Sequence, residues 1–319
     1  MTSEVVGVDT GRRSGTRGWP RGAGLLVGAG PAVLGLLPWL VTGLRLPIQN
    51  LWATETLPEQ MPRALLPFSQ YALTLIIAVI VTGAAAAGLC TRAARRRLPR
   101  RSVLAVLSGV LVVQLGALVQ TAVVVQAGLA GGFESAIYIA VLVAVTVTSV
   151  VVGVLTLALI AAGPPAAAVV GMSVGAVALA PWLSRLIVPL ATVAPTPSAL
   201  QLLAAARWVP AVLVGVVIAW AGLRTLRRAL AGATGLLLLW VVPALTTAIA
   251  ASAGTRVLAR RPAEMAQFAG QVFSQALTTP ALALPPLLVA LVVAAVGILG
   301  RFLRRRGRDQ SVSTSRGSP

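Results

Sequence analysis

The most constraining feature of this sequence is a short, strongly basic segment between two apolar runs. Residues 92–101 hold six arginines, and the run on either side is long enough to cross a bilayer. A short loop so rich in arginine stays on the cytoplasmic side of a membrane, because moving its charges across is unfavourable. The segment therefore predicts the direction of both neighbouring spans, and with it the topology of the chain.

Composition also predicts a membrane location. The chain has 319 residues, of which 57% are hydrophobic and 10% are charged. Soluble globular domains carry about 25% charged residues. A chain this apolar lacks the polar side chains to cover a water-facing surface, so lipid must be its main solvent. The sequence therefore predicts an all-α, multi-pass membrane protein, because helices satisfy their backbone polar groups inside a bilayer.

The basic residues are all arginine, and the formal net charge is +19. Arginine in place of lysine, together with abundant Ala, Gly, Pro and Val, is typical of a GC-rich genome such as that of an actinobacterium. The arginines flank apolar runs, so they indicate membrane topology rather than a nucleic-acid surface, and we expect no nucleic-acid partner. Those in residues 92–101 and 301–308 are expected to meet anionic lipids of the inner leaflet.

Hydropathy divides the chain into a basic cytoplasmic tail (1–21), a transmembrane domain (22–300) and a basic, disordered cytoplasmic tail (301–319). Eight spans are predicted in the domain, at about residues 23–44, 71–91, 102–127, 136–162, 166–183, 209–223, 229–253 and 280–300. Nineteen of the 26 arginines fall in segments that this scheme places inside. The bias predicts that both termini are cytoplasmic and that the membrane is the plasma (inner) membrane.

A weak internal repeat accompanies this topology. Leu37-Pro-Trp-Leu40 near the end of the first predicted span is echoed by Ala180-Pro-Trp-Leu183 near the end of the fifth. Four spans in each half would give a parallel 4+4 repeat. The alternative is coincidence, because proline and tryptophan are both common near membrane interfaces.

Motifs of catalysis and cofactor binding are missing from the sequence. There is no histidine, and the one cysteine, Cys90, excludes an intrachain disulfide and a cysteine-based metal cluster. We therefore expect no cofactor, no metal and no enzymatic activity. All seven acidic residues lie outside the predicted spans, which argues against a proton-coupled transporter.

Two sets of polar residues are the candidate sites. Gln114 and Thr121 are seven residues apart and share one helix face. With Thr246, they predict either a hydrogen-bonded seam between helices, which we favour, or a substrate path. An outer-face ligand cluster is the second candidate, with arginines for a phosphate and glutamates as bases, although solvated loop charges explain the same residues more simply. Its members are Glu55, Glu59, Glu134, Glu264, Arg185 and Arg256.

Residues 262–278 predict an amphipathic helix on the outer membrane surface. Pro262 suits a first helical turn, and apolar and polar residues fall on two separate stripes. The apolar stripe is Met265, Phe268, Val272, Phe273 and Ala276, and the polar stripe is Glu264, Gln267, Gln271, Gln275 and Thr278.

Two functions fit these patterns. The first is a non-catalytic scaffold or accessory subunit of a membrane or cell-envelope assembly, which binds a membrane-protein partner or a second copy through small-residue faces at residues 83–88 and 171–175. The second is a transporter, permease or lipid-handling protein with a site at the outer face or between the halves. The first predicts a closed bundle, and the second predicts a polar cavity.

Overall fold

A computed structural model describes residues 22–49, 51–95, 102–190, 192, 194–255 and 261–315. The regular secondary structure of this part is helical, with two short 3-10 helices, η1 (Pro58–Gln60) and η2 (Gln70–Ala72). Two isolated β-bridges pair Arg45 with Arg63 and Trp52 with Leu129. The predicted all-α fold class is therefore confirmed for the described residues. Most of the basic segment at residues 92–101 lies outside the described residues, and Arg92 and Arg95 are its two described arginines.

Seven helical stretches are long and apolar enough to cross a bilayer, so the chain is a polytopic membrane protein. Five are single helices that match five predicted spans closely. The seven are α3 (Leu73–Ala93), α4 (Ser102–Gly128), α5 (Phe133–Ala161), α6 (Pro165–Ile187), α7 (Pro197–Ala206) together with α8 (Val209–Ala221), α9 (Leu226–Gly254), and α11 (Pro280–Ser315).

The other two stretches run beyond their predicted bounds. The sixth predicted span begins at Pro197 rather than near residue 209, because α7 forms in a segment that the sequence places in an outer loop. Thr196 caps this helix by accepting a hydrogen bond from the backbone N–H of Ala199, and Pro197 occupies its first turn. The eighth predicted span lies in α11, which continues as a helix into the predicted C-terminal tail as far as Ser315.

The first predicted span, residues 23–44, is not one long helix. It forms α1 (Ala23–Gly35), of 13 residues, and the single turn α2 (Leu37–Leu40). Pro38 has no N–H to donate and its ring clashes with the preceding turn, which accounts for the break. A straight 13-residue helix is only about 20 Å long. This correction leaves seven full-length candidate spans and one shorter apolar helix in the described chain.

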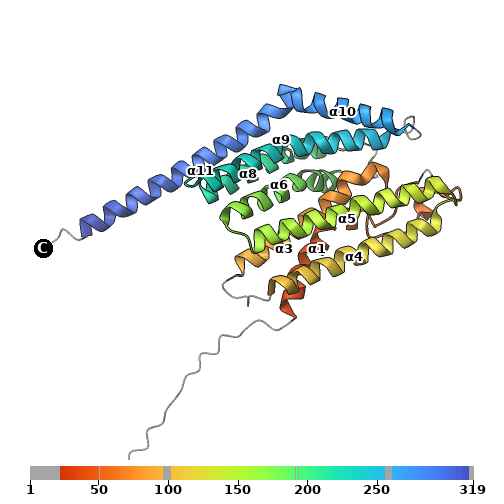
Figure 1. The fold of residues 1–319 in the computed structure, drawn as a ribbon, viewed down its shortest axis with the longest axis horizontal. Coiled ribbons are helices and arrows are strands. Elements are labelled where there is room, and N and C mark those ends of the chain that lie inside the picture. The colour runs from red at the N-terminus through yellow and green to blue at the C-terminus, as the bar shows by residue number, and fades with distance from the viewer. Residues whose placement is uncertain are drawn as a thin grey trace, which may run out of the picture.

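The short first helix still runs from one end of the bundle toward the other. Gly24 lies against Ala105 near the start of α4. The indole of Trp39 donates to the carbonyl of Ala64 at 2.8 Å in residues 44–72, which we call the outer segment after its predicted side of the membrane. Figure 1 shows that α1 begins at the end of the bundle where α3 is followed by α4, and that α11 runs toward this same end and projects beyond it. This arrangement fits an even number of crossings. Which side of the membrane holds that end stays a prediction.

Glycine lets the helices of the first half pack backbone against backbone. A Cβ at Gly28 of α1 would overlap the carbonyl oxygen of Val106 in α4. A Cβ at Gly35 would overlap the carbonyl oxygen of Val79 in α3. Such close approach raises the van der Waals contact between helices, which is the main attraction available in lipid.

The two small-residue faces that the sequence offers to a partner protein are used inside this chain. Gly83 contacts α1 and Gly88 contacts α5, while Gly171 contacts α5 and Gly175 contacts Ala85 of α3. All four glycines are buried. The predicted docking faces are therefore occupied by the protein's own helices, and any partner must bind elsewhere.

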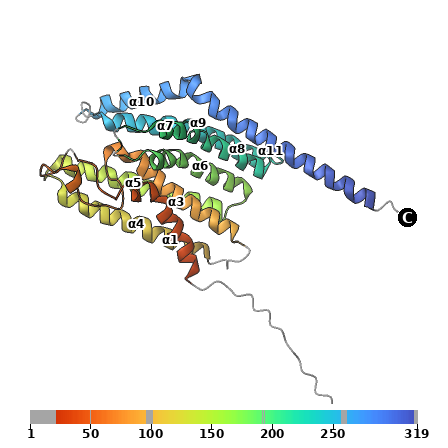
Figure 2. The same ribbon diagram turned by 180° about the vertical axis from the view of Figure 1, so that it is seen from behind.

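Helix α6 joins the two parts of the bundle. It contacts α3 and α5 on one side and α8 and α9 on the other. Its Trp182 donates to the carbonyl of Gly35 in α1 at 2.7 Å, and its Ser173 lies against Gly235 of α9. The order of the layers, from α4 at one edge through α6 to α9 and α10 (Pro262–Thr278) at the other, is visible in both views (Figure 1, Figure 2).

The amphipathic helix at residues 262–278 is confirmed as α10, whereas its position on the outer membrane surface stays a prediction. Its five predicted apolar residues are all partly buried, and its five predicted polar residues are all exposed. The helix runs back along α9, with which it makes its main contacts, rather than across the ends of the spans (Figure 1). The apolar stripe is therefore covered at least partly by protein, and the polar stripe faces away from the bundle.

Candidate functional site

Polar side chains of α4 hold the outer segment, residues 44–72, onto the bundle. Gln120 Oε1 accepts the backbone N–H of Leu65, and Thr121 Oγ1 accepts that of Leu66, each at 2.9 Å. Both N–H groups belong to an irregular segment with no helix or sheet partner for them. Unpaired buried backbone groups are costly, so these side chains fix the segment in place. Its apolar residues then complete the outer part of the hydrophobic core.

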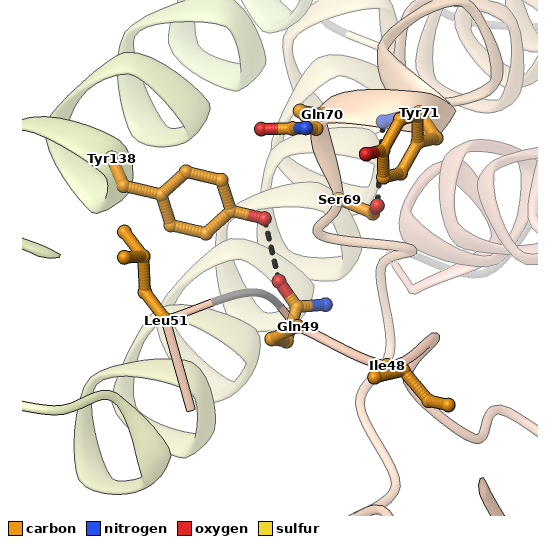
Figure 3. A pocket seen from close by; sticks show the side chains of 7 residues that line it. All are labelled: Ile48, Gln49, Leu51, Ser69, Gln70, Tyr71 and Tyr138. Carbon is orange, nitrogen blue, oxygen red and sulfur yellow. Dashed lines mark hydrogen bonds between the residues drawn. The ribbon is translucent and has the colours of Figure 1, made fainter. Parts of the chain in front are cut away.

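A second polar contact ties the same segment to α5. Tyr138 of α5 donates its hydroxyl hydrogen to Gln49 Oε1 at 2.5 Å, and Gln49 Nε2 donates to the carbonyls of Phe68 and Pro47, each at 2.9 Å. Figure 3 shows Tyr138 and Gln49 meeting across a small pocket. The pocket holds about 20 Å³, which is room for about one water molecule. The pocket is too small for an organic ligand, and the hydrogen bonds of Tyr138 and Gln49 beside it join the segment to the bundle.

Gln49, Gln120 and Tyr138 were not among the residues predicted from the sequence. Gln120 is next to the predicted Thr121 in the sequence, so its position could have indicated that it contacts the same segment. Gln49 and Tyr138 are 89 residues apart, and no local pattern connects them. The contact became visible only once the fold had brought the segment to α5.

The predicted pair Gln114 and Thr121 lies on the buried side of α4. Gln114 Nε2 donates to the carbonyl of Ile80 in α3 at 2.9 Å, and Thr121 bonds the outer segment. Thr246 is partly buried and donates to the carbonyl of Pro243 in its own helix at 3.0 Å. None of the three lines the small pocket or the groove described below. The contacts of Gln114 and Thr121 are those of a helix seam, and a substrate path through these residues stays a prediction.

The predicted outer-face residues are spread over several elements. Glu55 and Glu59 are exposed in the outer segment, Glu134 is exposed in the first turn of α5, and Arg185 is half-buried in the last turn of α6.

Glu264 lies in α10, where it pairs with Arg261 at 3.3 Å, and Arg256 lies outside the described residues. The helices that carry Glu134 and Glu264 lie on opposite sides of α6 (Figure 1, Figure 2). A shared ligand site for the six residues stays a prediction.

At the other end of the bundle, arginines cap helix C-termini. Arg92 donates to the carbonyls of Ile160 and Gly163 at 2.7 and 3.1 Å, where α5 ends. Arg228 donates to the carbonyl of Ala221 at 3.1 Å, where α8 ends. The last carbonyls of a helix have no partner within it and carry partial negative charge, so a guanidinium stabilises them. These arginines have a structural role in addition to marking topology.

An apolar groove of about 500 Å³ opens between α8 and α11 near the same end. Arg301 of α11 stands at its edge and donates from Nη1 to the carbonyls of Ala219 and Trp220. Arg92 lies over the ring of Trp220, 5.2 Å from its centroid. The lining residues are Val216, Ala219, Trp220, Val292, Val293, Val296, Gly297 and Arg301.

The exposed polar stripe of α10 is a further candidate surface, because it carries a row of glutamine side chains. Gln267, Gln271 and Gln275 recur every four residues and are all exposed, so their amides form one row. The hydroxyls of Ser274 and Thr278 are satisfied by carbonyls of their own helix. The three amides make no hydrogen bond within the described part of the chain.

The C-terminal end of the row lies beside the middle of α9. Trp240 Nε1 donates to the carbonyl of Leu277 at 3.3 Å. Trp240 is 14 residues beyond the start of α9 at Leu226, which is about 21 Å along the helix. A hydrocarbon core is about 30 Å thick. The last turns of α10 therefore lie beside the middle of α9, a helix long enough to cross the bilayer.

Within the described residues, no group of three or more histidine, cysteine, aspartate or glutamate side chains could hold a metal ion. No protein-family model, curated protein or solved structure matches the chain. The candidate surfaces are thus the glutamine row of α10, which we define as Gln267, Gln271 and Gln275, and the α8–α11 groove.

Proposed function

We propose that this protein is a non-catalytic integral membrane protein that acts as a scaffold or accessory subunit, and that a second copy of the chain docks on the glutamine row of α10. The observation that carries the proposal is a row of three exposed, unpaired amides on a helix that packs along α9, a candidate membrane span. Amides facing hydrocarbon are costly unless they find hydrogen-bond partners. A protein surface that covers this row removes that cost.

A second copy is the occupant that the chemistry of the row favours. Each glutamine amide carries two donor hydrogens and one acceptor oxygen, so the row is complementary to itself. A twofold axis through the row would place the same three residues on both sides of the interface, as closed dimers require. Hydrogen bonds between helices in membranes contribute about 0.6–2 kcal/mol each.

The packing of the bundle supports a binding role over transport. Gln114 and Thr121 are satisfied by neighbouring backbone, and the polar pocket at the outer end holds about one water. The groove between α8 and α11 is lined by apolar residues apart from Arg301 at its edge. A permease needs a polar path, and neither described cavity provides one.

We also propose that the bundle is a parallel 4+4 repeat. In the first half, α1 contacts α3 and α4, and α3 contacts α5. In the second half, α6 contacts α8 and α9, and α8 contacts α11. The pairing of the four helices is thus the same in both halves, which supports the repeat suggested by the two Pro-Trp motifs. In each half the tryptophan of that motif donates its indole hydrogen to a backbone carbonyl.

The proposed topology places both termini in the cytoplasm of a bacterial cell, with the protein in its plasma membrane. The arginine bias supports this orientation, and the shared end of α1 and α11 agrees with it. Reporter fusions after Pro99, after Pro165 and at the C-terminus should all report the cytoplasm. A periplasmic signal after Pro99 would reverse the scheme.

Cysteine cross-linking tests the docking surface. The chain has one cysteine, so Cys90→Ser gives a cysteine-free background. Single variants Gln267→Cys, Gln271→Cys and Gln275→Cys are then treated in native membranes with a short thiol-reactive cross-linker. Val112→Cys is the matched control, because Val112 is 70% exposed on α4 at the opposite edge of the bundle.

The proposal predicts a cross-linked dimer for the α10 cysteines and little product for the control. Absence of dimer from all three α10 positions would overturn it, as would equal dimer from Val112→Cys. A product of another mass would identify a different protein as the occupant and exclude the second copy.

A further inference from the structure

We propose that the groove between α8 and α11 binds one anionic phospholipid, with an acyl chain along the groove and the phosphate at Arg301. This site goes beyond the proposed assembly role. It lies at the basic end of the bundle, away from the glutamine row of α10. The two proposals therefore rest on different residues and can fail separately.

The shape and lining of the groove suit an acyl chain. Its volume of about 500 Å³ falls within the roughly 300–1,000 Å³ typical of sites for small ligands. Six of its lining residues are valine, alanine or glycine, which offer no hydrogen bonds to a polar ligand. Gly297 brings α11 close to Ala219 of α8, so the floor of the groove is formed by two touching helices.

The polar end of the groove suits a phosphate. The Nη1 group of Arg301 is held by the carbonyls of Ala219 and Trp220, which fixes the guanidinium at the groove edge. Its Nε and Nη2 groups make no hydrogen bond within the described residues and remain as donors. Guanidinium groups bind phosphate oxygens through paired, charge-assisted hydrogen bonds.

Surrounding charges reinforce this preference. Arg304 is exposed one turn beyond Arg301, and Arg224 and Arg227 are exposed in and next to the connection between α8 and α9. Trp220, at the groove, provides the amphipathic ring that commonly lies at the level of lipid headgroups. The nearest acidic residue along α11 is Asp309, eight residues after Arg301. The local field therefore favours an anionic headgroup over a zwitterionic one.

The groove is also placed to receive its ligand from the bilayer. Only 11% of the residues in the most apolar stretch of α11 are buried inside the protein, so most of this helix faces lipid. A soluble phosphate would meet the arginines but would leave the apolar groove empty. A phospholipid satisfies both parts, so we assign the site to a lipid of the leaflet at the basic end.

Native mass spectrometry of the detergent-purified full chain tests this site. Phosphatidylglycerol and phosphatidylcholine are titrated separately, and the first bound lipid is quantified. We expect phosphatidylglycerol to bind about tenfold more tightly, which corresponds to about 1.4 kcal/mol. Arg301→Gln should remove most of this preference. Val296→Phe, which fills the groove without changing any charge, should weaken the binding of both lipids.

Arg207→Gln is the matched control. The guanidinium of Arg207 lies 4.6 Å from the ring centroid of Trp208 at the opposite end of α8, so this variant removes an equivalent arginine next to a tryptophan. It should bind phosphatidylglycerol like the natural protein.

Equal binding of the two lipids would overturn the proposal. So would normal binding by Val296→Phe, or the same loss in Arg207→Gln as in Arg301→Gln. Displacement of the lipid by millimolar inorganic phosphate would likewise contradict a role for the apolar groove. Val296→Phe keeps the test valid if Arg301→Gln fails to fold.

Discussion

Two helices of similar hydropathy, α3 in the first half of the chain and α11 in the second, are packed very differently. In the most apolar stretch of α3, 67% of residues are buried inside the protein, whereas the figure for α11 is 11%. Helix α3 is surrounded by α1, α5 and α6, while α11 contacts mainly α8. Hydropathy therefore predicts which helices lie in the membrane, but it does not predict whether such a helix is surrounded by other helices or by lipid.

Small residues account for much of this difference. The inner half of α3 contains Gly83, four alanines and Gly88, and its neighbours supply Gly35 of α1 and Gly153 of α5. These residues let backbones approach within van der Waals contact on several sides. The lipid-facing stretch of α11 is rich in leucine and valine, which keep neighbours at a greater distance. The first half thus forms a compact body, and the second half presents open surfaces.

The largest expected effect comes from filling a glycine contact in the compact half. Gly28→Leu should destabilise the protein by about 3 kcal/mol, because even a Cβ would overlap the backbone of Val106. Thermal unfolding in detergent measures the loss. Gly30→Leu in the same helix is the control, since a Cβ at Gly30 would meet nothing within 4 Å and the variant should behave like the natural protein.

The same change in the open half should cost less. Gly297→Leu also creates an overlap, with Ala219 at 2.5 Å, but α11 has lipid on most of its surface and is free to shift. We expect a loss of about 1 kcal/mol, at the low end for overpacking. A loss as large as that of Gly28→Leu would show that the second half is as rigid as the first.

Two tryptophans provide the next comparison. Trp39 is 2% exposed and its indole bonds Ala64 at 2.8 Å, so Trp39→Phe leaves a buried carbonyl unpaired and should cost about 2 kcal/mol. Trp240 is 39% exposed and its bond to Leu277 is 3.3 Å long. Trp240→Phe should cost under about 0.5 kcal/mol. Chemical unfolding followed by circular dichroism compares the two, and equal losses would contradict the assigned difference.

The smallest expected difference in stability is between valine variants of two threonines. Thr121→Val removes the acceptor for the backbone N–H of Leu66 and should cost about 1.5 kcal/mol. Thr246→Val removes a bond within its own helix at a partly exposed position and should change stability by less than about 0.5 kcal/mol. Proteolysis of residues 44–72 should be faster in Thr121→Val alone. Faster cleavage in both variants would mean that the threonine bond is not what holds this segment.

The sequence predicted those features that depend on local pattern. The two stripes of α10 and five of the spans follow from periodicity and from runs of apolar residues. The positions of α1 and α7 were harder, because they depend on prolines. Pro38 interrupts a long apolar run, whereas Pro197 begins a helix in a segment that resembles a loop.

Features that depend on distant contacts were beyond prediction. Gln49 meets Tyr138 across 89 residues, and Arg92 reaches the end of α5 across 68. The glycine faces of α3 and α6 were recognised as packing surfaces, yet the sequence does not say whether the partner is the same chain or another. The groove is formed by α8 and α11, which are far apart in the sequence, so no single helix reveals it.

The oligomeric state in lipid tests the proposed self-association through α10 most directly. The natural protein and the triple variant Gln267→Leu, Gln271→Leu, Gln275→Leu are reconstituted in lipid nanodiscs and weighed by native mass spectrometry. We predict two copies per disc for the natural protein and one copy for the triple variant, with the same unfolding temperature for both. A natural protein that stays monomeric at every protein-to-lipid ratio, or a triple variant that remains dimeric, would contradict docking on the glutamine row.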